Sequence, residues 1–270
     1  MTGSIDIPVL LECAVEAARA GGRHALDNAR RRREILKTFK HDVKLALDVE
    51  SQREVEAAVR ARFPDHAILG EEDPYDAAIP QSAAGYLWIV DPIDGTVNFS
   101  HGLPLWCCSV AVKHHDRTVA GAVFAPELNR LFTAAAGQPA LCNGVPIHVS
   151  PTATLASAIV CTGTNKSGEP DVPPFTFFER IASAVQRPRI TGCAALDLCF
   201  VACGAADGYF ESGIFLWDVA AAGLLVERAG GRAEALGFLD AKRLRFVASN
   251  GLIHEELKRA IDAPQTTLPR

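Results

Sequence analysis

The sequence lacks an uninterrupted apolar stretch long enough to cross a membrane, although 49% of its 270 residues are hydrophobic. It also lacks the basic segment and following apolar segment that open a secretory signal. Its eight cysteines form no CxxC pair or other spacing typical of a zinc motif. These absences predict a reduced, cytoplasmic protein that does not associate with membranes.

An excess of positive charge is missing as well. The formal net charge is −5, which gives no support to a nucleic-acid-binding role. The run from Arg30 to Arg33 is the exception, and a patch for polyanions is one interpretation of it. A short, isolated run is more typical of a solvated helix end, where cations suit the C-terminal dipole. We therefore expect no nucleic-acid partner.

Nucleotide-binding signatures are also absent, since no G-x-G-x-x-G follows a strand and no P-loop occurs. The chain contains no repeat and no low-complexity segment, and it is long enough to bury a large core. We expect one domain over 1–270. Within it we expect an N-terminal lobe over about 1–150 and a C-terminal lobe over about 151–270.

The hydrophobic pattern predicts helices over 6–34 and 48–62, a strand over 67–70 and a loop over 74–85. Three successive strands follow, in CCSVAVKH, TVAGAVFAP and RLFTAAAG. From residue 157 onward, strands in AIVCTGT, PRITG, DGYFE and RFVAS alternate with helices over 175–185, 194–204 and 217–231. This mixture predicts a layered α+β fold with partly antiparallel sheets, not a doubly wound Rossmann fold.

The most informative segment is WIVDPIDGTVNF, in which an apolar strand ends at Asp91 and Asp94 follows three residues later. Gly95 permits close approach of another group, and a helix beginning at Thr96 would present free N–H groups to an anion. Two carboxylates would repel a phosphate unless a divalent cation lay between them. Mg²⁺ favours such oxygen ligands. The alternative is an Asp-Pro turn capped by Asp94 and Thr96.

Three further acids occupy comparable places. Glu71 follows the AILG strand, Asp218 lies at the start of an apolar helix, and Asp48 begins the helix before Glu71. Taken singly, Glu71 is most simply a solvated loop residue and Asp218 a helix N-cap. Taken as a set, they suggest two or more metals, as in two-metal phosphatases, where the ions lie about 3.5–4 Å apart. The D-x-x-D-G-T spacing is one residue longer than the D-x-D-G-T of covalent aspartyl phosphatases, which disfavours that mechanism.

The segments GEED, WIVDPIDGTVNFSHGLP and LWDVAAAGLLVERAGG resemble the inositol monophosphatase family of Mg²⁺-dependent, lithium-sensitive phosphatases. The resemblance runs from about Lys37 to Gly231. It implies a layered α-β-α-β-α sandwich, a homodimer, and two or three Mg²⁺ ions without an organic cofactor.

The resemblance also implies roles for individual residues. The implied metal ligands are Glu71, Asp91, the backbone carbonyl of Ile93, Asp94 and Asp218. Most of them would lie in the N-terminal lobe, whereas Asp218 and the substrate wall would lie in the C-terminal lobe. The residues implied to orient and activate the attacking water are Glu71 and Thr96, with Asp48 supporting Thr96. The implied substrate-binding residues are Asp94, Gly95, Thr96, Gly192, Cys193, Ala194, Glu211 and Asp218. Lys37 matches a position on a mobile loop near the third metal.

By resemblance, the function is hydrolysis of a polyol or sugar-alcohol monophosphate, most simply myo-inositol 1-phosphate, by a metal-activated water. Histidinol phosphate, fructose 1,6-bisphosphate and 3′-phosphoadenosine nucleotides are alternative substrates within the family. A regulatory binding protein that keeps the fold is the alternative from another class. Two positions depart from the family pattern: Leu45 stands where a threonine is frequent, and Cys193 where a small hydroxyl residue is common.

Overall fold

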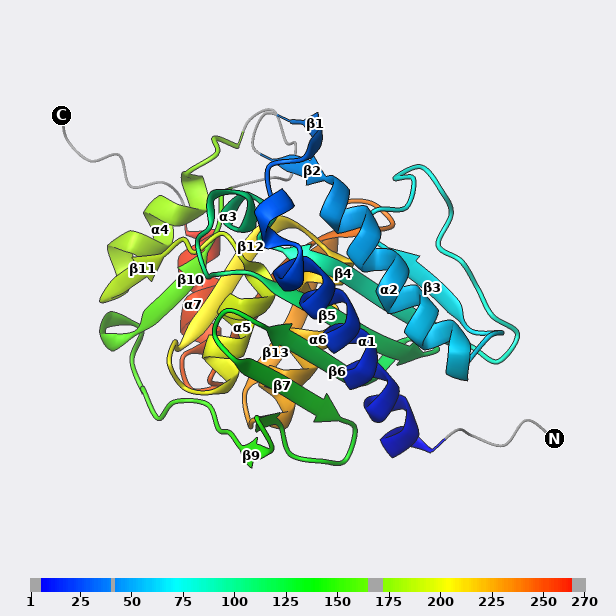
Figure 1. The fold of residues 1–270 in the computed structure, drawn as a ribbon. Coiled ribbons are helices and arrows are strands. Elements are labelled where there is room, and N and C mark those ends of the chain that lie inside the picture. Colours follow the sequence, from blue (N-terminus) through cyan, green and yellow to red (C-terminus); the bar gives the residue numbers. More distant parts are fainter. Residues whose placement is uncertain (1–5, 40–41, 165–171, 264–270) are drawn as a thin grey trace.

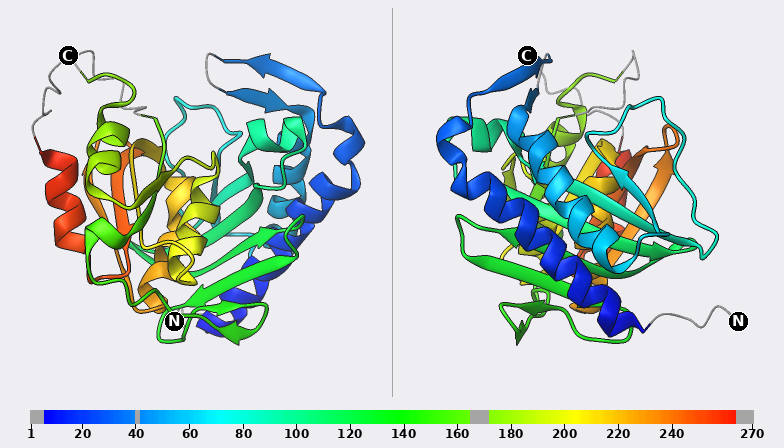
Figure 2. Two further views of the ribbon diagram at one scale, coloured as in Figure 1. Left: turned by 90° about the vertical axis from the view of Figure 1, so that its left-hand side faces the viewer. Right: turned by 45° about the vertical axis from the view of Figure 1, so that its right-hand side comes forward.

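The structure is a computed structural model that describes residues 6–39, 42–164 and 172–263. It consists of five layers, visible edge-on in Figure 2: a helix pair, a large sheet, a central helix pair, a smaller sheet and an outer helix pair. This arrangement confirms the predicted layered sandwich.

The large sheet has seven strands in the order β3-β4-β5-β6-β7-β8-β9. Its strands are β3 (Ala67–Gly70), β4 (Tyr86–Asp94), β5 (Cys107–His114), β6 (Arg117–Ala125), β7 (Arg130–Ala135), β8 (Leu141–Cys142) and β9 (Val145–Pro146). Only the β3–β4 pair is parallel in this sheet. Along β4, Trp88 and Val90 pack into one apolar cluster while Ile89 packs into another, so both faces of the sheet are covered.

The smaller sheet has five strands in the order β11-β10-β12-β14-β13. Its strands are β10 (Ile159–Thr162), β11 (Arg187–Arg189), β12 (Gly208–Phe215), β13 (Arg232–Phe238) and β14 (Arg243–Ser249). β10 pairs in parallel with β11 and β12, whereas β14 pairs antiparallel with β12 and β13. Both sheets are therefore mixed, as predicted. A separate hairpin is formed by β1 (Ile35–Thr38) and β2 (Val43–Leu45).

The helices supply the other three layers (Figure 1). They are α1 (Ile7–Asp27), α2 (Ala46–Arg62), α3 (Thr96–His101), α4 (Thr176–Ala184), α5 (Ala194–Ala202), α6 (Leu216–Arg228) and α7 (His254–Asp262), with short 3₁₀ turns η1 (Ala29–Arg31) and η2 (Leu155–Ser157). The helices α1 and α2 cover the outer face of the large sheet, α5 and α6 lie between the sheets, and α4 and α7 cover the smaller sheet. None of the helices in the described residues has the length and apolar character needed to span a bilayer.

Several boundaries differ from the sequence predictions. The helix expected over 6–34 ends at Asp27, because the Asn28 side chain donates a hydrogen bond to the carbonyl of His24 at 2.9 Å and closes the last turn. The strand expected in PRITG ends at Arg189, before the site residue Gly192. β13 was not predicted; it is half-exposed and contains Gly, Ala and Glu, which are poor strand formers.

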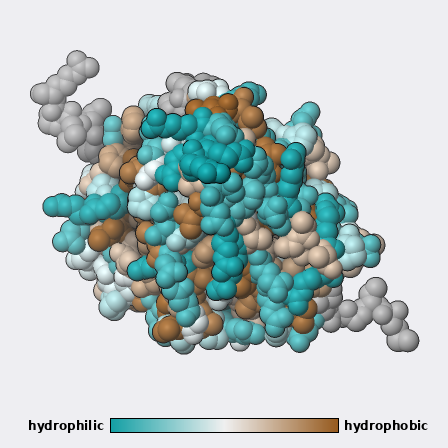
Figure 3. Space-filling model, viewed as in Figure 1, coloured by the Kyte–Doolittle hydropathy of each residue, from teal (hydrophilic) through white to brown (hydrophobic). Residues whose placement is uncertain are grey.

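The arginine run lies beyond the end of α1, with Arg30 and Arg31 in η1 and Arg32 and Arg33 after it. Arg31 forms ion pairs with Glu34 and Glu50, both at 2.8 Å, and the Arg32 guanidinium lies 5.3 Å from the centroid of the Phe99 ring. These arginines therefore have partners within the chain. Figure 3 shows that this face of the molecule is largely hydrophilic, with a hydrophobic patch at the top where β1 lies in Figure 1.

Candidate active site

Asp91 and Asp94 lie at the end of β4, where the strand stops pairing regularly with β5. Asp91 lies opposite Ser109 and Asp94 opposite Cys107, with an irregularity between the two pairs. Residues three apart point to opposite faces of a regular strand, but an irregularity of this kind can turn both toward one face. Carboxylate oxygens of Asp91, Asp94 and Asp218 consequently lie within 4.8 Å of one another.

Asp218 and Glu71 come to the same place from neighbouring elements. Asp218 lies in the first turn of α6, the central helix packed between the sheets. Glu71 follows β3, the parallel neighbour of β4, and its N–H donates to the carbonyl of Val90 at 3.0 Å. Its carboxyl group is hydrogen-bonded to that of Asp91. The structure thus brings together Glu71, Asp91, Asp94 and Asp218, which we call the acidic cluster.

The acidic cluster crowds four carboxyl groups together in a buried place. Burial, followed by the charges of Glu71, Asp94 and Asp218, raises the pKa of Asp91 well above its ordinary value. Burial, followed by the charges of Asp218, Glu72 and Asp48, does the same to the pKa of Glu71. Both shifts favour the protonated forms of these carboxyl groups when no metal is bound.

These residues fit a hard divalent cation. Asp91, Asp94 and Asp218 place three buried carboxylates within reach of one ion, which matches the preference of Mg²⁺ for oxygen ligands. Mg²⁺ binding would displace any protons that these carboxyl groups carry. The Ile93 carbonyl, the fifth expected ligand, accepts a hydrogen bond from Thr96 Oγ1 at 2.9 Å, and the Ile93 N–H donates to Asp91 Oδ1 at 3.1 Å. The segment from Asp91 to Thr96 is therefore held together by its own polar contacts.

Asp94 also joins this segment to α5. Its Oδ1 accepts a hydrogen bond from the Ala194 N–H at 3.3 Å, and its Oδ2 accepts one from the Ala195 N–H at 2.6 Å. Cys193, the residue before α5, donates its thiol to Asp94 Oδ2 at 3.2 Å. Three expected substrate-binding positions, Gly192, Cys193 and Ala194, are thereby placed beside Asp94 and Gly95.

Asp48 and Asp218 occupy equivalent positions, each in the first turn of its helix. Asp48 Oδ2 accepts the Leu45 N–H at 2.6 Å, and Asp218 Oδ2 accepts the Phe215 N–H at 2.9 Å. The interpretation of Asp218 as an N-cap was therefore wrong, since Phe215 precedes the helix and Asp218 is its third residue. Leu45 does not weaken this turn, because its backbone supplies the hydrogen bond and its side chain is buried.

The expected support of Thr96 by Asp48 is not formed. The Thr96 hydroxyl donates to the Ile93 carbonyl, and Asp48 Oδ2 is taken by the Leu45 N–H. Asp48 Oδ1 is buried without a hydrogen-bond partner, and burial raises the pKa of Asp48 well above its ordinary value. The charge of Asp48 contributes to the raised pKa of Glu71.

Two other expected site residues lie apart from these contacts. Lys37 was expected on a loop, but it lies in strand β1, because 35–38 pair with β2; its Nζ is 4.9 Å from the centroid of the Phe39 ring. Glu211 lies in β12 and accepts a hydrogen bond from the buried Tyr209 hydroxyl at 3.0 Å.

Sequence reasoning did not single out Cys107 or the pair Thr191 and Asp197. Cys107 reaches the site only because β5 places it opposite Asp94, and no local pattern reveals that register. The Thr191 hydroxyl donates to Asp197 Oδ1 at 2.7 Å and fixes the segment before α5. Burial raises the pKa of Asp197 to about 8. Asp197 could have been noticed in the sequence, because it is an acid three residues after Ala194, at the start of an otherwise apolar helix.

Gly95 gives a direct test of the packing at this site. Its φ is +88°, and a Cβ there would lie 2.8 Å from the Leu105 carbonyl oxygen and 3.2 Å from Cys193 Cβ. We expect Gly95→Ala to lower the free energy of unfolding by about 3 kcal/mol, from left-handed strain plus overpacking. Gly137→Ala is the control, because φ is +79° and nothing lies within 4 Å. In urea unfolding, Gly137→Ala should lower the free energy of unfolding by only about 1 kcal/mol. Equal losses in the two variants would contradict the close packing at Gly95.

Known proteins resemble this chain over almost its whole length. Residues 6–263 match the model of the inositol monophosphatase family. The chain is 35% identical over 265 residues to inositol-1-monophosphatase of Synechocystis, which covers 96% of this chain and 90% of that protein. It is 38% identical over 226 residues to Nus factor SuhB of Haemophilus influenzae, and this match covers 82% of this chain and 83% of that protein. The solved structure of inositol monophosphatase from Anabaena matches with a TM-score of 0.81 and 34% identity, covering 95% of this chain and 96% of that one.

The sequence match, the shared fold and the acidic cluster at the end of β4 agree with one another. The chain therefore belongs to the inositol monophosphatase family and is a hydrolase of phosphate monoesters.

Proposed function

We propose that the protein hydrolyses a polyol monophosphate, most simply myo-inositol 1-phosphate, with Mg²⁺ bound at the acidic cluster. The observation that carries this proposal is the meeting of three buried carboxylates within 4.8 Å, with Glu71 bonded to one of them. The ligands would be Glu71, Asp91, the Ile93 carbonyl, Asp94 and Asp218. Bound Mg²⁺ lowers the pKa of coordinated water and screens the phosphate charge.

The chain's own groups would position the water and the phosphate. Thr96 Oγ1 donates to Ile93, which leaves its lone pairs to accept a proton of the attacking water. Glu71 would orient the same water and take its proton. The N–H groups of Gly95 and Thr96 would bind phosphate oxygens, since the first N–H groups of a helix have no intrahelical partner. Catalysis in this proposal is positioning and electrostatics, without a covalent intermediate.

The leaving alcohol would lie against α5 and β12. Asp94, the Ala194 N–H and Glu211 offer acceptors and a donor for hydroxyl groups, which suits a polyol better than a nucleobase. Neither the segment around the acidic cluster nor α5 carries a Lys or Arg cluster for a second phosphate, which disfavours bisphosphates. Cys193 stands where a hydroxyl residue is common, and a thiol is a weaker donor.

A substrate panel tests the choice of alcohol. We expect kcat/KM for myo-inositol 1-phosphate to exceed that for histidinol phosphate, fructose 1,6-bisphosphate and 3′-phosphoadenosine 5′-phosphate by at least about tenfold. Glu211→Gln should lower kcat/KM for the polyol by about tenfold, mainly through KM. Phosphate release is the readout. A higher kcat/KM for the bisphosphate or the nucleotide would contradict the proposed substrate class.

A second candidate function follows from the 38% identity to a protein named Nus factor SuhB. A role through contact with another macromolecule would not need the acidic cluster. Asp94→Asn separates the two, because turnover should be lost while a contact-based role survives. Persistence of full phosphate release in that variant would show that Asp94 is not a catalytic ligand.

The remaining family expectations belong to the same proposal. They are inhibition by lithium, a homodimer and a cytoplasmic location. Lithium titration of phosphate release and light scattering of the purified protein test the first two.

A further inference from the structure

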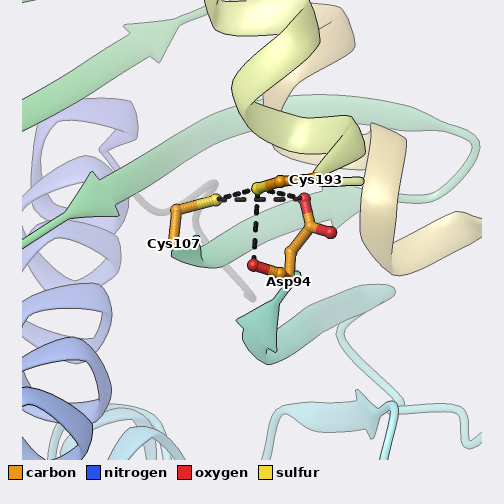
Figure 4. Close-up of side chains that lie close together, drawn as sticks. All are labelled: Asp94, Cys107 and Cys193. Atoms are coloured by element: carbon orange, nitrogen blue, oxygen red, sulfur yellow. Dashed lines mark hydrogen bonds between the residues drawn. The ribbon is translucent and has the colours of Figure 1, made fainter. Parts of the chain in front are cut away.

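Asp94 belongs to a second group of potential metal ligands, formed with two cysteines. Cys107 from β5 and Cys193 at the start of α5 both point their sulfur atoms toward Asp94 (Figure 4). The two Sγ atoms are 3.7 Å apart. Asp94 Oδ2 lies 3.2 Å from Cys193 Sγ and 3.9 Å from Cys107 Sγ. Two sulfur atoms and one oxygen thus form a small triangle.

This triangle has the dimensions of one face of a tetrahedral zinc site. With Zn–S near 2.3 Å and Zn–O near 2.0 Å, tetrahedral geometry separates two sulfurs by about 3.8 Å and sulfur from oxygen by about 3.5 Å. The observed sulfur pair is 3.7 Å apart, and the two sulfur–oxygen distances, 3.2 and 3.9 Å, lie on either side of the ideal one. An ion could therefore bind with side-chain movements of only a few tenths of an ångström.

The ligand types of the triangle favour a thiophilic ion. Cys107 is 0% exposed, Cys193 is 1% exposed and Asp94 is 7% exposed. Thiolate ligands select Zn²⁺ and similar ions over Mg²⁺, which prefers oxygen. The Ala195 N–H already donates to Asp94 Oδ2, and such outer hydrogen bonds orient ligating carboxylates in zinc sites.

We propose that Cys107, Cys193 and Asp94 form a binding site for one Zn²⁺ ion, with water in the fourth position. Binding replaces the two thiol protons, which pass to the buffer, and leaves both sulfurs as thiolates. The site is separate from the magnesium ligands except for Asp94. If the proposed function holds, Zn²⁺ would draw Asp94 away from the acidic cluster and lower Mg²⁺-dependent phosphate release; the binding itself does not rest on that function.

A cobalt titration tests the site without using activity. It uses the full chain with reduced thiols, freed of transition metals and kept in excess Mg²⁺. We expect a thiolate-to-cobalt charge-transfer band and intense tetrahedral d–d bands that saturate at one Co²⁺ per chain and are removed by Zn²⁺. Cys107→Ala should lower Zn²⁺ affinity at least about 100-fold. Cys199→Ala is the matched control, because Cys199 is also 0% exposed and lies on α5, outside the triangle.

The outcomes that overturn the proposal are an absent charge-transfer band, a band that survives Cys107→Ala, or an equal loss in Cys199→Ala. X-ray absorption at the zinc edge of the wild-type protein supplies a measurement that needs no variant. It should show two sulfur atoms in the first coordination shell of zinc. A shell of nitrogen and oxygen alone would contradict the site even if Cys107→Ala fails to fold.

Discussion

Asp91→Asn is expected to lower kcat at least about 10³-fold, equivalent to about 4 kcal/mol of lost transition-state stabilisation by the metal. The same change should stabilise the metal-free protein. Asp91 is 1% exposed and lies against Glu71, Asp94 and Asp218, so the amide replaces a carboxyl group whose ionisation burial and these neighbours oppose, at no change in size. Asparagine can still accept the Ile93 N–H and can donate to Glu71.

The expected gain in unfolding free energy is of the order of 1 kcal/mol, which would raise the melting temperature by about 2–4 °C. Phosphate release and thermal unfolding in chelator measure the two effects. Asp197→Asn is the matched control for activity and Mg²⁺ binding, since Asp197 is equally buried but bonds to Thr191 outside the acidic cluster. A metal-free Asp91→Asn protein less stable than wild type would contradict the raised pKa of Asp91 and the cost of ionising its carboxyl group.

Mg²⁺ is expected to stabilise the protein more strongly as the pH rises. Burial and neighbouring carboxylates raise the folded-state pKa of Glu71 and Asp91 above the unfolded value, which is about 4 for such groups. A raised carboxyl pKa contributes stability that is complete below the unfolded value and is lost as the pH rises through the folded value. The metal-free protein should therefore become less stable from about pH 4 upward.

Mg²⁺ competes with protons for the carboxyl groups of the acidic cluster. It binds their ionised forms, which become more populated as the pH rises. At a hundredfold excess over its Kd the expected stabilisation is about 2.7 kcal/mol, or roughly 5–10 °C in melting temperature. Thermal unfolding with Mg²⁺ and with chelator should show a larger shift at about pH 8 than at about pH 6. Asp91→Asn should reduce the shift, and Asp197→Asn should not. A shift that is equal at both pH values would contradict the account.

The proximity of the acids could be anticipated from the sequence because each ends a strand or begins a helix. Strand ends and helix starts in a layered fold meet at the edges of its sheets, and Glu71, Asp91 and Asp218 meet in this way. The way in which Asp94 joins them could not be predicted. It depends on the irregular pairing between Asp91 and Asp94, and that irregularity is a property of β4 and β5 together.

The incorrect predictions have similar causes. The position of Asp218 depends on Phe215 ending β12, so only the strand's length shows which residue precedes the helix. The bonding of Thr96 to Ile93, not Asp48, depends on the turn between β4 and α3. Lys37 lies in a strand because 43–45 return beside it, and a hairpin this short leaves little hydrophobic pattern. The triangle of Asp94, Cys107 and Cys193 joins three elements whose sequences show no shared motif.

The most direct test of the central claim is a magnesium titration of phosphate release from myo-inositol 1-phosphate, followed by chelation and renewed addition of Mg²⁺. The account predicts release that rises with Mg²⁺, stops in chelator and returns when Mg²⁺ is restored. Release that is unchanged by chelator, or no release at any Mg²⁺ concentration from correctly folded protein, would contradict it.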